Sequence, residues 1–240
     1  MIRSTCLFFA LAALLYAVPA QAESPLNGAL EVRMGFYQPS FSEKGLTGTN
    51  PYKKIFGDKS MFLFGLEGDF QFWKGFGSLG AFGVMSYGRV SGKGLMADDT
   101  KSADTTRFTM LPLGAGLVYR FDVLAKRYQI PLVPVLKGGL VYSFWWVSDG
   151  NGDTATWTDP NTDKMRTASG GTAGYMGSLG LHLLLDIFEP HTSVTFDNEM
   201  GVNNSYAFIE VQTTQLNDFG SKDSFDLSDT NLMFGLSFEL

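Results

Sequence analysis

One short stretch of the sequence combines residues that could catalyse a reaction. In His191-Thr192-Ser193 an imidazole stands two residues before a hydroxyl, and a nearby base of this kind can activate a hydroxyl for acyl transfer. The other histidine, His182, alternates with leucines, which predicts a packed or hydrogen-bonded side chain within a strand. Acyl transfer on a lipid is therefore the one enzymatic hypothesis that the sequence raises.

A second stretch, residues 149–153, has the sequence Asp-Gly-Asn-Gly-Asp and matches the beginning of a calcium-binding loop. The match then ends, because Thr154 and Pro160 stand where such a loop needs Gly and Glu. A solvated turn is the main interpretation, and a weak divalent-ion site that includes Asp159 or Asp163 is the alternative. The sequence has no phosphate-binding loop, zinc-ligand spacing or catalytic triad, so we predict no cofactor, no metal and no catalytic residues.

The N-terminus and the composition indicate an exported protein. Residues 1–22 contain Arg3 and then an apolar run too short to span a membrane, and small residues before the end predict a signal peptide cleaved after Ala22. The only cysteine, Cys6, lies in this segment, so the predicted domain, residues 23–240, has no disulfide. The formal charge of −6 argues against nucleic acid as a partner.

Eight segments predict β-strands, and no apolar run is long enough for a transmembrane helix. They span residues 29–37, 61–73, 78–89, 107–121, 132–147, 175–188, 204–212 and 231–240. Nearly every segment has one apolar face, and no helix is available to cover these faces, so lipid is their natural partner. Pro112 interrupts the fourth segment, and we expect a β-bulge there because proline cannot donate to a sheet ladder.

The connections between these segments alternate in length. Long polar connections span residues 38–60, 90–106, 148–174 and 213–228, and the connections at the other end span 74–77, 122–131 and 189–203. This alternation predicts an all-β fold, namely an eight-stranded antiparallel up-and-down transmembrane β-barrel. Its location would be the bacterial outer membrane, with periplasmic termini and four long outer loops.

The interior of an eight-stranded barrel is just wide enough for side chains to fill. Alternation turns charged side chains inward, and an unpaired charge there would be costly, so each must find a partner. We predict ion pairs of Arg33 with Glu67 or Asp69, and of Lys137 with Asp186. The wider inward set also includes Glu31, Arg120, Glu210 and Glu239.

Aromatic side chains are expected at the two membrane interfaces. The predicted outer girdle consists of Phe36, Phe62, Phe64 and Trp146, and the predicted inner girdle consists of Phe72, Trp73, Tyr119 and Phe121. The last segment alternates apolar and polar residues up to the C-terminus, as the final strand of an outer-membrane barrel does. We interpret Phe234, Phe238 and Leu240 as its signal to the barrel-assembly machinery.

Several short segments resemble the outer-membrane β-barrel domain proteins described from myxobacteria and related delta-type proteobacteria, which are small barrels of the OmpA and OmpX type. The segments are residues 30–35, 50–52 with 56–58, 130–134, 185–190, 201–206 and 227–240. The resemblance implies a barrel fold and an outer-membrane location. It implies no activity and no functional residues.

These observations predict an integral outer-membrane barrel with a plugged lumen, which acts structurally or through its exposed loops in envelope integrity, adhesion or surface contact. The expected partners are outer-membrane lipids, lipopolysaccharide and the barrel-assembly machinery, and the surface ligand stays open. One alternative is a narrow channel for ions or small apolar molecules. A lipid-A-modifying enzyme is less favoured, because His191 and Ser193 fall in a predicted periplasmic connection, away from lipopolysaccharide.

Overall fold

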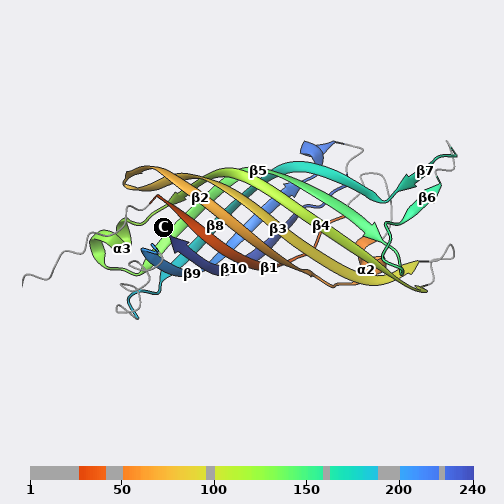
Figure 1. The fold of residues 1–240 in the computed structure, drawn as a ribbon, viewed down its shortest axis with the longest axis horizontal. Coiled ribbons are helices and arrows are strands. Elements are labelled where there is room, and N and C mark those ends of the chain that lie inside the picture. Colours follow the sequence, from red (N-terminus) through yellow and green to blue (C-terminus); the bar gives the residue numbers. More distant parts are fainter. Residues whose placement is uncertain (1–26, 42–50, 96–100, 159–162, 189–200, 222–224) are drawn as a thin grey trace, which may run out of the picture.

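The chain folds into a closed β-barrel whose strands run up and down in sequence order (Figure 1). The computed structural model describes residues 27–41, 51–95, 101–158, 163–188, 201–221 and 225–240. Around the barrel the strand order is β1-β10-β9-β8-β5-β4-β3-β2, and each neighbouring pair is antiparallel. Because β1 pairs with β10 and closes the wall, the predicted eight-stranded antiparallel barrel is confirmed.

The wall strands are longer than the sequence pattern predicts. Their bounds are β1 Gly28–Tyr37, β2 Met61–Gly75, β3 Gly77–Leu95, β4 Lys101–Arg120, β5 Leu132–Ser148, β8 Ser169–Leu184, β9 Asn204–Leu216 and β10 Asp229–Glu239. β3 and β4 occupy most of residues 90–106, where we expected a long loop. Their extensions are rich in Ser, Thr and Lys, and a strand in water needs no apolar face, so a pattern of apolar residues did not predict them.

Smaller elements lie at the two ends of the barrel. β6 Thr156–Thr158 and β7 Met165–Thr167 form a hairpin at the same end as helix α2 Pro51–Phe56, and helix α3 Val123–Tyr128 lies at the other end with the C-terminus (Figure 1). A 3-10 helix, η1 Asp218–Gly220, connects β9 to β10. Within the described ranges, no helix has the length and apolar character needed to cross a membrane. The predicted signal peptide and His191-Thr192-Ser193 lie outside the described residues.

Pro112 interrupts one ladder without the β-bulge that we expected. On the β5 side, Pro112 pairs with Ser143. On the β3 side, the pairing stops for two residues of each strand and then resumes in the same register. The register shifts lie elsewhere, after Gln71 in β2 and after Lys93 in β3. The expected bulge is therefore wrong, because a proline that removes one N–H can leave a short gap in a ladder without adding a residue.

Alternation along the strands turns apolar side chains outward and polar ones inward. In β2, Phe62, Phe64 and Leu66 are 47%, 44% and 42% exposed, whereas Glu67 is 1% exposed. The wall is closed, so these Phe and Leu side chains cover its outer surface rather than a core between two sheets. An apolar exterior of this extent requires an apolar surrounding, which is the acyl-chain region of a membrane.

The wall is tightly packed at one point where β4 meets β5. Two glycines at this point allow a matched pair of substitutions. A Cβ at Gly116 would lie 2.2 Å from the Gly138 carbonyl oxygen, whereas a Cβ at Gly138 would meet no atom within 4 Å. We predict that Gly116→Ala lowers the free energy of unfolding by about 1–3 kcal/mol, because backbone atoms must move. Gly138→Ala should change it by less than about 0.5 kcal/mol. Urea unfolding of the refolded barrel measures both values, and equal effects would contradict this packing.

Candidate functional site

A layer of buried charged side chains crosses the barrel interior. They are Glu31 and Arg33 from β1, Glu67 and Asp69 from β2, Arg120 from β4, Lys137 from β5, Glu210 from β9 and Glu239 from β10. Glu31 and Glu67 are direct neighbours in the β1–β2 ladder, so like charges lie side by side. Like charges opposite each other destabilise a sheet, so this layer depends on basic side chains that reach into it.

The Arg33 guanidinium joins β1, β2 and β9. Arg33 forms an ion pair with Glu67, and its Nη2 lies 2.6 Å from Glu210 Oε2. Nη2 also donates a hydrogen bond to Gln212 Oε1 at 3.3 Å. Of the two partners predicted for Arg33, Glu67 makes the contact, while Asp69 is held by Arg120 at 2.6 Å from Nη2 to Oδ2.

The Lys137 ammonium lies among three carboxylates. Its Nζ is 2.6 Å from Glu31 Oε2, 2.6 Å from Glu67 Oε1 and 3.0 Å from Glu210 Oε1. β5 and β1 are four places apart in the ring of eight strands, so the contact of Lys137 with Glu31 spans the full width of the barrel. One side chain thus balances acids from three strands.

Asp186, the partner predicted for Lys137, lies outside this layer. β8 ends at Leu184, and Asp186 belongs to the turn that follows, where its Oδ1 accepts a hydrogen bond from the Ser205 backbone N–H at 3.2 Å. The predicted pair is therefore wrong. The prediction failed because the alternation of leucines continues past the end of β8. The sequence pattern therefore did not show where β8 stops pairing with its neighbours.

His182 is an interior residue packed against β9. Its Nε2 lies 3.2 Å from Glu210 Oε1, and its ring stacks on Phe208 with centroids 4.9 Å apart. Ligand atoms of Glu31, His182 and Glu210 lie within 4.8 Å of one another, a spacing that a metal ion could use. The Lys137 ammonium bridges the two glutamates, however, so a cation of the protein itself takes that place.

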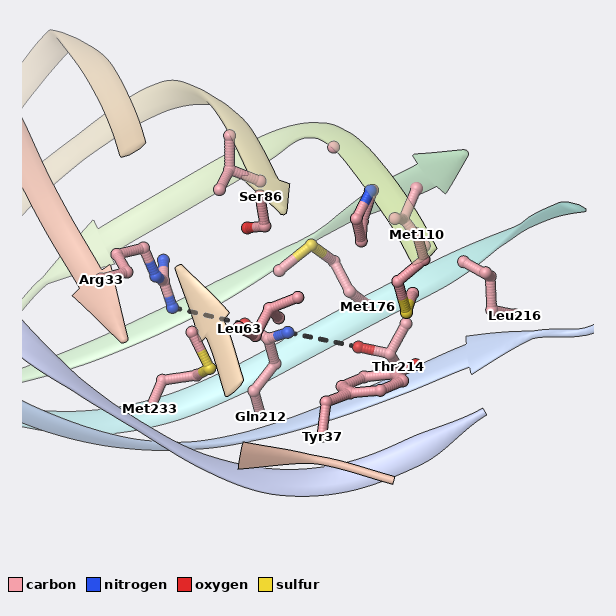
Figure 2. Close-up of a pocket in the computed structure, with 14 residues that line it drawn as sticks. Arg33, Tyr37, Leu63, Ser86, Met110, Met176, Gln212, Thr214, Leu216 and Met233 are labelled. Atoms are coloured by element: carbon pink, nitrogen blue, oxygen red, sulfur yellow. Dashed lines mark hydrogen bonds between the residues drawn. The ribbon is translucent and has the colours of Figure 1, made fainter. Parts of the chain in front are cut away.

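Beyond the charged layer, the interior becomes apolar. Figure 2 shows Met110, Met176 and Met233 around a cavity, with Arg33 at one side and Leu216 at the other. The cavity measures about 20 Å³, which is room for about one water molecule. The free space between these side chains is therefore small.

An aromatic cap, formed by Phe41, Tyr52, Phe56, Phe108 and Phe225, closes the end of the barrel where α2 lies. The Phe41 ring centroid is 5.0 Å from that of Tyr52, 5.1 Å from that of Phe108 and 4.4 Å from that of Phe225. Helix α2 supplies Tyr52 and Phe56, whose centroids are 4.9 Å apart. Sequence reasoning missed this cap, and the only available signal was the presence of aromatic residues in connections that are otherwise polar.

Tyr52 connects the cap to the segment that leads from α2 into β2. Its hydroxyl donates a hydrogen bond to the Lys59 carbonyl oxygen at 2.6 Å. Burial, together with the nearby Asp229 carboxylate, raises the pKa of Tyr52 to about 12. The hydroxyl therefore keeps its proton, and this hydrogen bond, throughout the physiological pH range.

The predicted girdle residues lie on the barrel exterior. Phe36, Phe62, Phe64, Phe72 and Trp73 are exposed, and Trp146, Tyr119 and Phe121 are half-buried. The consecutive residues Phe72 and Trp73 can both face outward because the register shifts between Gln71 and Trp73. On β10 and at the C-terminus, Phe234 and Leu240 are exposed and Phe238 is half-buried.

Residues 149–153 form a closed turn. Asp149 Oδ1 accepts hydrogen bonds from the backbone N–H groups of Asn151, Gly152 and Asp153 at 2.9, 3.0 and 3.2 Å. That oxygen serves the turn itself, which supports the interpretation as a solvated turn. Asp163 is exposed near the β6–β7 hairpin, and Asp159 lies outside the described residues.

The fold is similar to those of solved outer-membrane proteins. The outer membrane protein OprG from Pseudomonas aeruginosa has a TM-score of 0.50 at 14% identity over 92% of this chain and 98% of that chain. Neisserial surface protein A has a TM-score of 0.46 at 12% identity over 92% of this chain and 100% of that chain. Ail of Yersinia pestis, in complex with the heparin analogue sucrose octasulfate, has a TM-score of 0.45 at 15% identity over 90% and 100%. No protein-family model matches the sequence, and no curated protein matches it.

A closed antiparallel wall, an apolar exterior and a charged, side-chain-filled interior together define an integral outer-membrane β-barrel protein. A closed barrel has no open sheet edge, and apart from the short gap at Pro112 the ladders of this wall are continuous or shifted by a bulge, which is what allows strands to span a membrane. The protein is therefore located in the bacterial outer membrane, as predicted.

The charged layer generates a prediction about stability. Lys137→Met removes the cation among three buried carboxylates, so we expect a loss of about 3–5 kcal/mol in the free energy of unfolding. The control Lys126→Met removes an exposed ammonium paired with Asp122 and should cost at most about 1 kcal/mol. Urea unfolding in the same micelles compares them. If Lys137→Met costs no more than the control, the layer does not depend on this ammonium.

Proposed function

We propose that this protein is an outer-membrane barrel with a plugged lumen, which acts structurally or through its exposed loops in envelope integrity, adhesion or surface contact. The observation that carries the proposal is that the interior is filled at three successive levels. The ion-paired layer, the methionine-lined level and the aromatic cap lie one beyond another along the barrel.

Each level opposes the passage of solutes for a different physical reason. In the charged layer, an entering ion would have to break ion pairs that are already desolvated. At the level of the methionines, the free space of about 20 Å³ holds about one water molecule. In the cap, Phe41 packs edge to face against Phe108 and Phe225, and the Tyr52 hydroxyl already donates to the Lys59 carbonyl oxygen, so an entering ion would meet mainly apolar ring surface.

The two ends of the barrel support the proposed orientation. The end with α2 and the β6–β7 hairpin carries the two longest connections, residues 38–60 and 149–168 (Figure 1). The end with the C-terminus carries α3, the tight connection between β2 and β3, and one long connection, residues 185–203. Outer-membrane barrels place their longer loops outside and short turns in the periplasm. We infer that the hairpin faces the exterior, that both termini face the periplasm, and that residues 1–22 are the export signal.

Partners follow from the same geometry. The exposed rings at the two levels of the exterior support the assignment of outer and inner girdles in contact with outer-membrane lipids and lipopolysaccharide. The apolar face of β10, with Phe234, Phe238 and Leu240, supports recognition by the barrel-assembly machinery. We also propose that the protein belongs to the barrel family described from myxobacteria and related bacteria. We propose in addition that it has no enzymatic activity.

Conductance in planar bilayers tests the plug. We expect the refolded protein to show no steady conductance, because the interior is filled with side chains. Arg33→Ala removes a buried partner of Glu67 and Glu210, and with the methionine level and the aromatic cap still in place it should also stay closed. Steady conductance in the native protein that rises with Arg33→Ala would replace the plug by the narrow-channel alternative.

Removal of the β6–β7 hairpin tests the role of the exposed loops. Ala168 N–H donates to Ala155 O at 2.7 Å at the base of the hairpin, so residues 156–167 can be replaced by a short Gly-Ser link without cutting a wall strand. We expect the shortened barrel to fold and insert, while attachment of cells to surfaces or to each other decreases. A heat-dependent shift in gel mobility verifies folding, and unchanged attachment would favour a purely structural role.

A further inference from the structure

Four basic residues gather on the outer surface of the barrel, just beyond the exposed aromatic rings. We call Lys59, Arg89, Lys93 and Arg107 the basic patch. Arg89 follows the exposed Tyr87 by two positions on β3 and pairs in the ladder with Phe62 of β2. Side chains two positions apart share one face of a strand, so Arg89 extends from the same exterior face as these rings.

The register of β3 and β4 brings the patch together. Arg89 pairs with Thr109, Ser91 with Arg107 and Lys93 with Thr105. Arg107 is therefore a diagonal neighbour of both Arg89 and Lys93, and such neighbours lie roughly 7–8 Å apart between backbone positions. Two long basic side chains at that separation can reach a single phosphate group.

Hydrogen bonds to backbone carbonyl groups position three of the four side chains, and among the described residues none of the three pairs with a carboxylate. Lys59 Nζ donates to Ser91 O at 3.1 Å, and Lys93 Nζ donates to Ala103 O at 2.5 Å. Arg107 Nη1 donates to the Asp149 backbone carbonyl at 3.4 Å. In the described part of the chain, the Arg89 guanidinium has no hydrogen-bond or ion-pair partner.

Among the described residues, the acids near the patch are paired elsewhere or lie on the opposite face of their strand. Asp58 pairs with Lys53 at 3.3 Å, and Asp149 Oδ1 accepts three N–H groups of its own turn. Asp104 lies three positions from Arg107 on β4 and so belongs to the opposite face of that strand. The whole chain has a formal charge of −6, so a group of four cations on one surface departs from its general character.

We propose that the basic patch binds the phosphate groups of outer-leaflet lipid, as lipopolysaccharide carries on its lipid A. This proposal rests on the proposed orientation, with α2 and the hairpin outside, because only then does the patch reach the outer leaflet. Its height supports a lipid source, since headgroups lie directly beyond the aromatic belt. Guanidinium groups bind phosphate oxygens through paired N–H donors, which suits Arg89 and Arg107.

Native mass spectrometry of the mature chain refolded in neutral detergent micelles tests the patch. The probes are bisphosphorylated lipid A, chemically dephosphorylated lipid A, and inorganic phosphate as a competitor. The variant is Arg89→Gln with Arg107→Gln. The matched control is Lys74→Gln with Arg127→Gln, which removes the same charge at the opposite end of the barrel.

We expect the native chain and the control to retain bisphosphorylated lipid A, and the patch variant to retain at least about tenfold less. All three should bind dephosphorylated lipid A weakly. Equal retention by the patch variant and the control would overturn the proposal, and so would full displacement of lipid A by excess inorganic phosphate, which would indicate a site for the free ion. A heat-dependent gel shift verifies that each variant is folded.

A separate measurement tests the orientation on which the proposal rests. Asn151→Cys places a thiol in the exposed turn after β5, and a membrane-impermeant maleimide should label it on intact cells. Labelling only after permeabilisation would contradict the proposed orientation and with it the outer-leaflet assignment. Labelling of intact cells together with unchanged lipid A retention would overturn the basic patch alone and leave the proposed function standing.

Discussion

The barrel interior depends on one interaction, the contact of the buried Lys137 ammonium with three carboxylates. Inside a closed wall that is surrounded by acyl chains, an inward-facing charge has no solvent around it. Each carboxylate must therefore be neutralised by a side chain from elsewhere in the wall. Because Lys137 on β5 reaches Glu31 on β1, the neutralising contacts cross the barrel rather than follow one ladder. The same contacts that satisfy the charges therefore connect opposite walls and fill the lumen.

The rest of the interior is organised around this layer. On one side of it, methionine and leucine side chains occupy the lumen, and their flexible shapes suit an irregular space that holds about one water molecule. Farther out, Phe41 and helix α2 bring aromatic rings from the β1–β2 connection onto Phe108 of the wall. The barrel is thus closed partly by wall residues and partly by a connection that folds back over its end.

The exterior has its own division of chemistry. Phe and Leu side chains cover the middle of the wall, and the strand extensions beyond them carry Ser, Thr and basic residues. The extended β3–β4 hairpin places Arg89 and Arg107 beside each other at this boundary, although the chain as a whole is acidic. Strand length beyond the apolar belt is therefore what creates a surface suited to charged headgroups.

The amino-acid sequence by itself determined the strand number, the membrane class and the facing of residues such as Phe62 and Glu67, because a period of two assigns alternate side chains to opposite faces of any strand. It did not determine the full length of β3 and β4, since strands in water need no apolar pattern. Only the tertiary structure decided that Lys137 contacts Glu31, Glu67 and Glu210 rather than Asp186. The physical reason is that partners across a barrel are set by strand tilt and stagger, which the alternation of residue types along one strand does not contain.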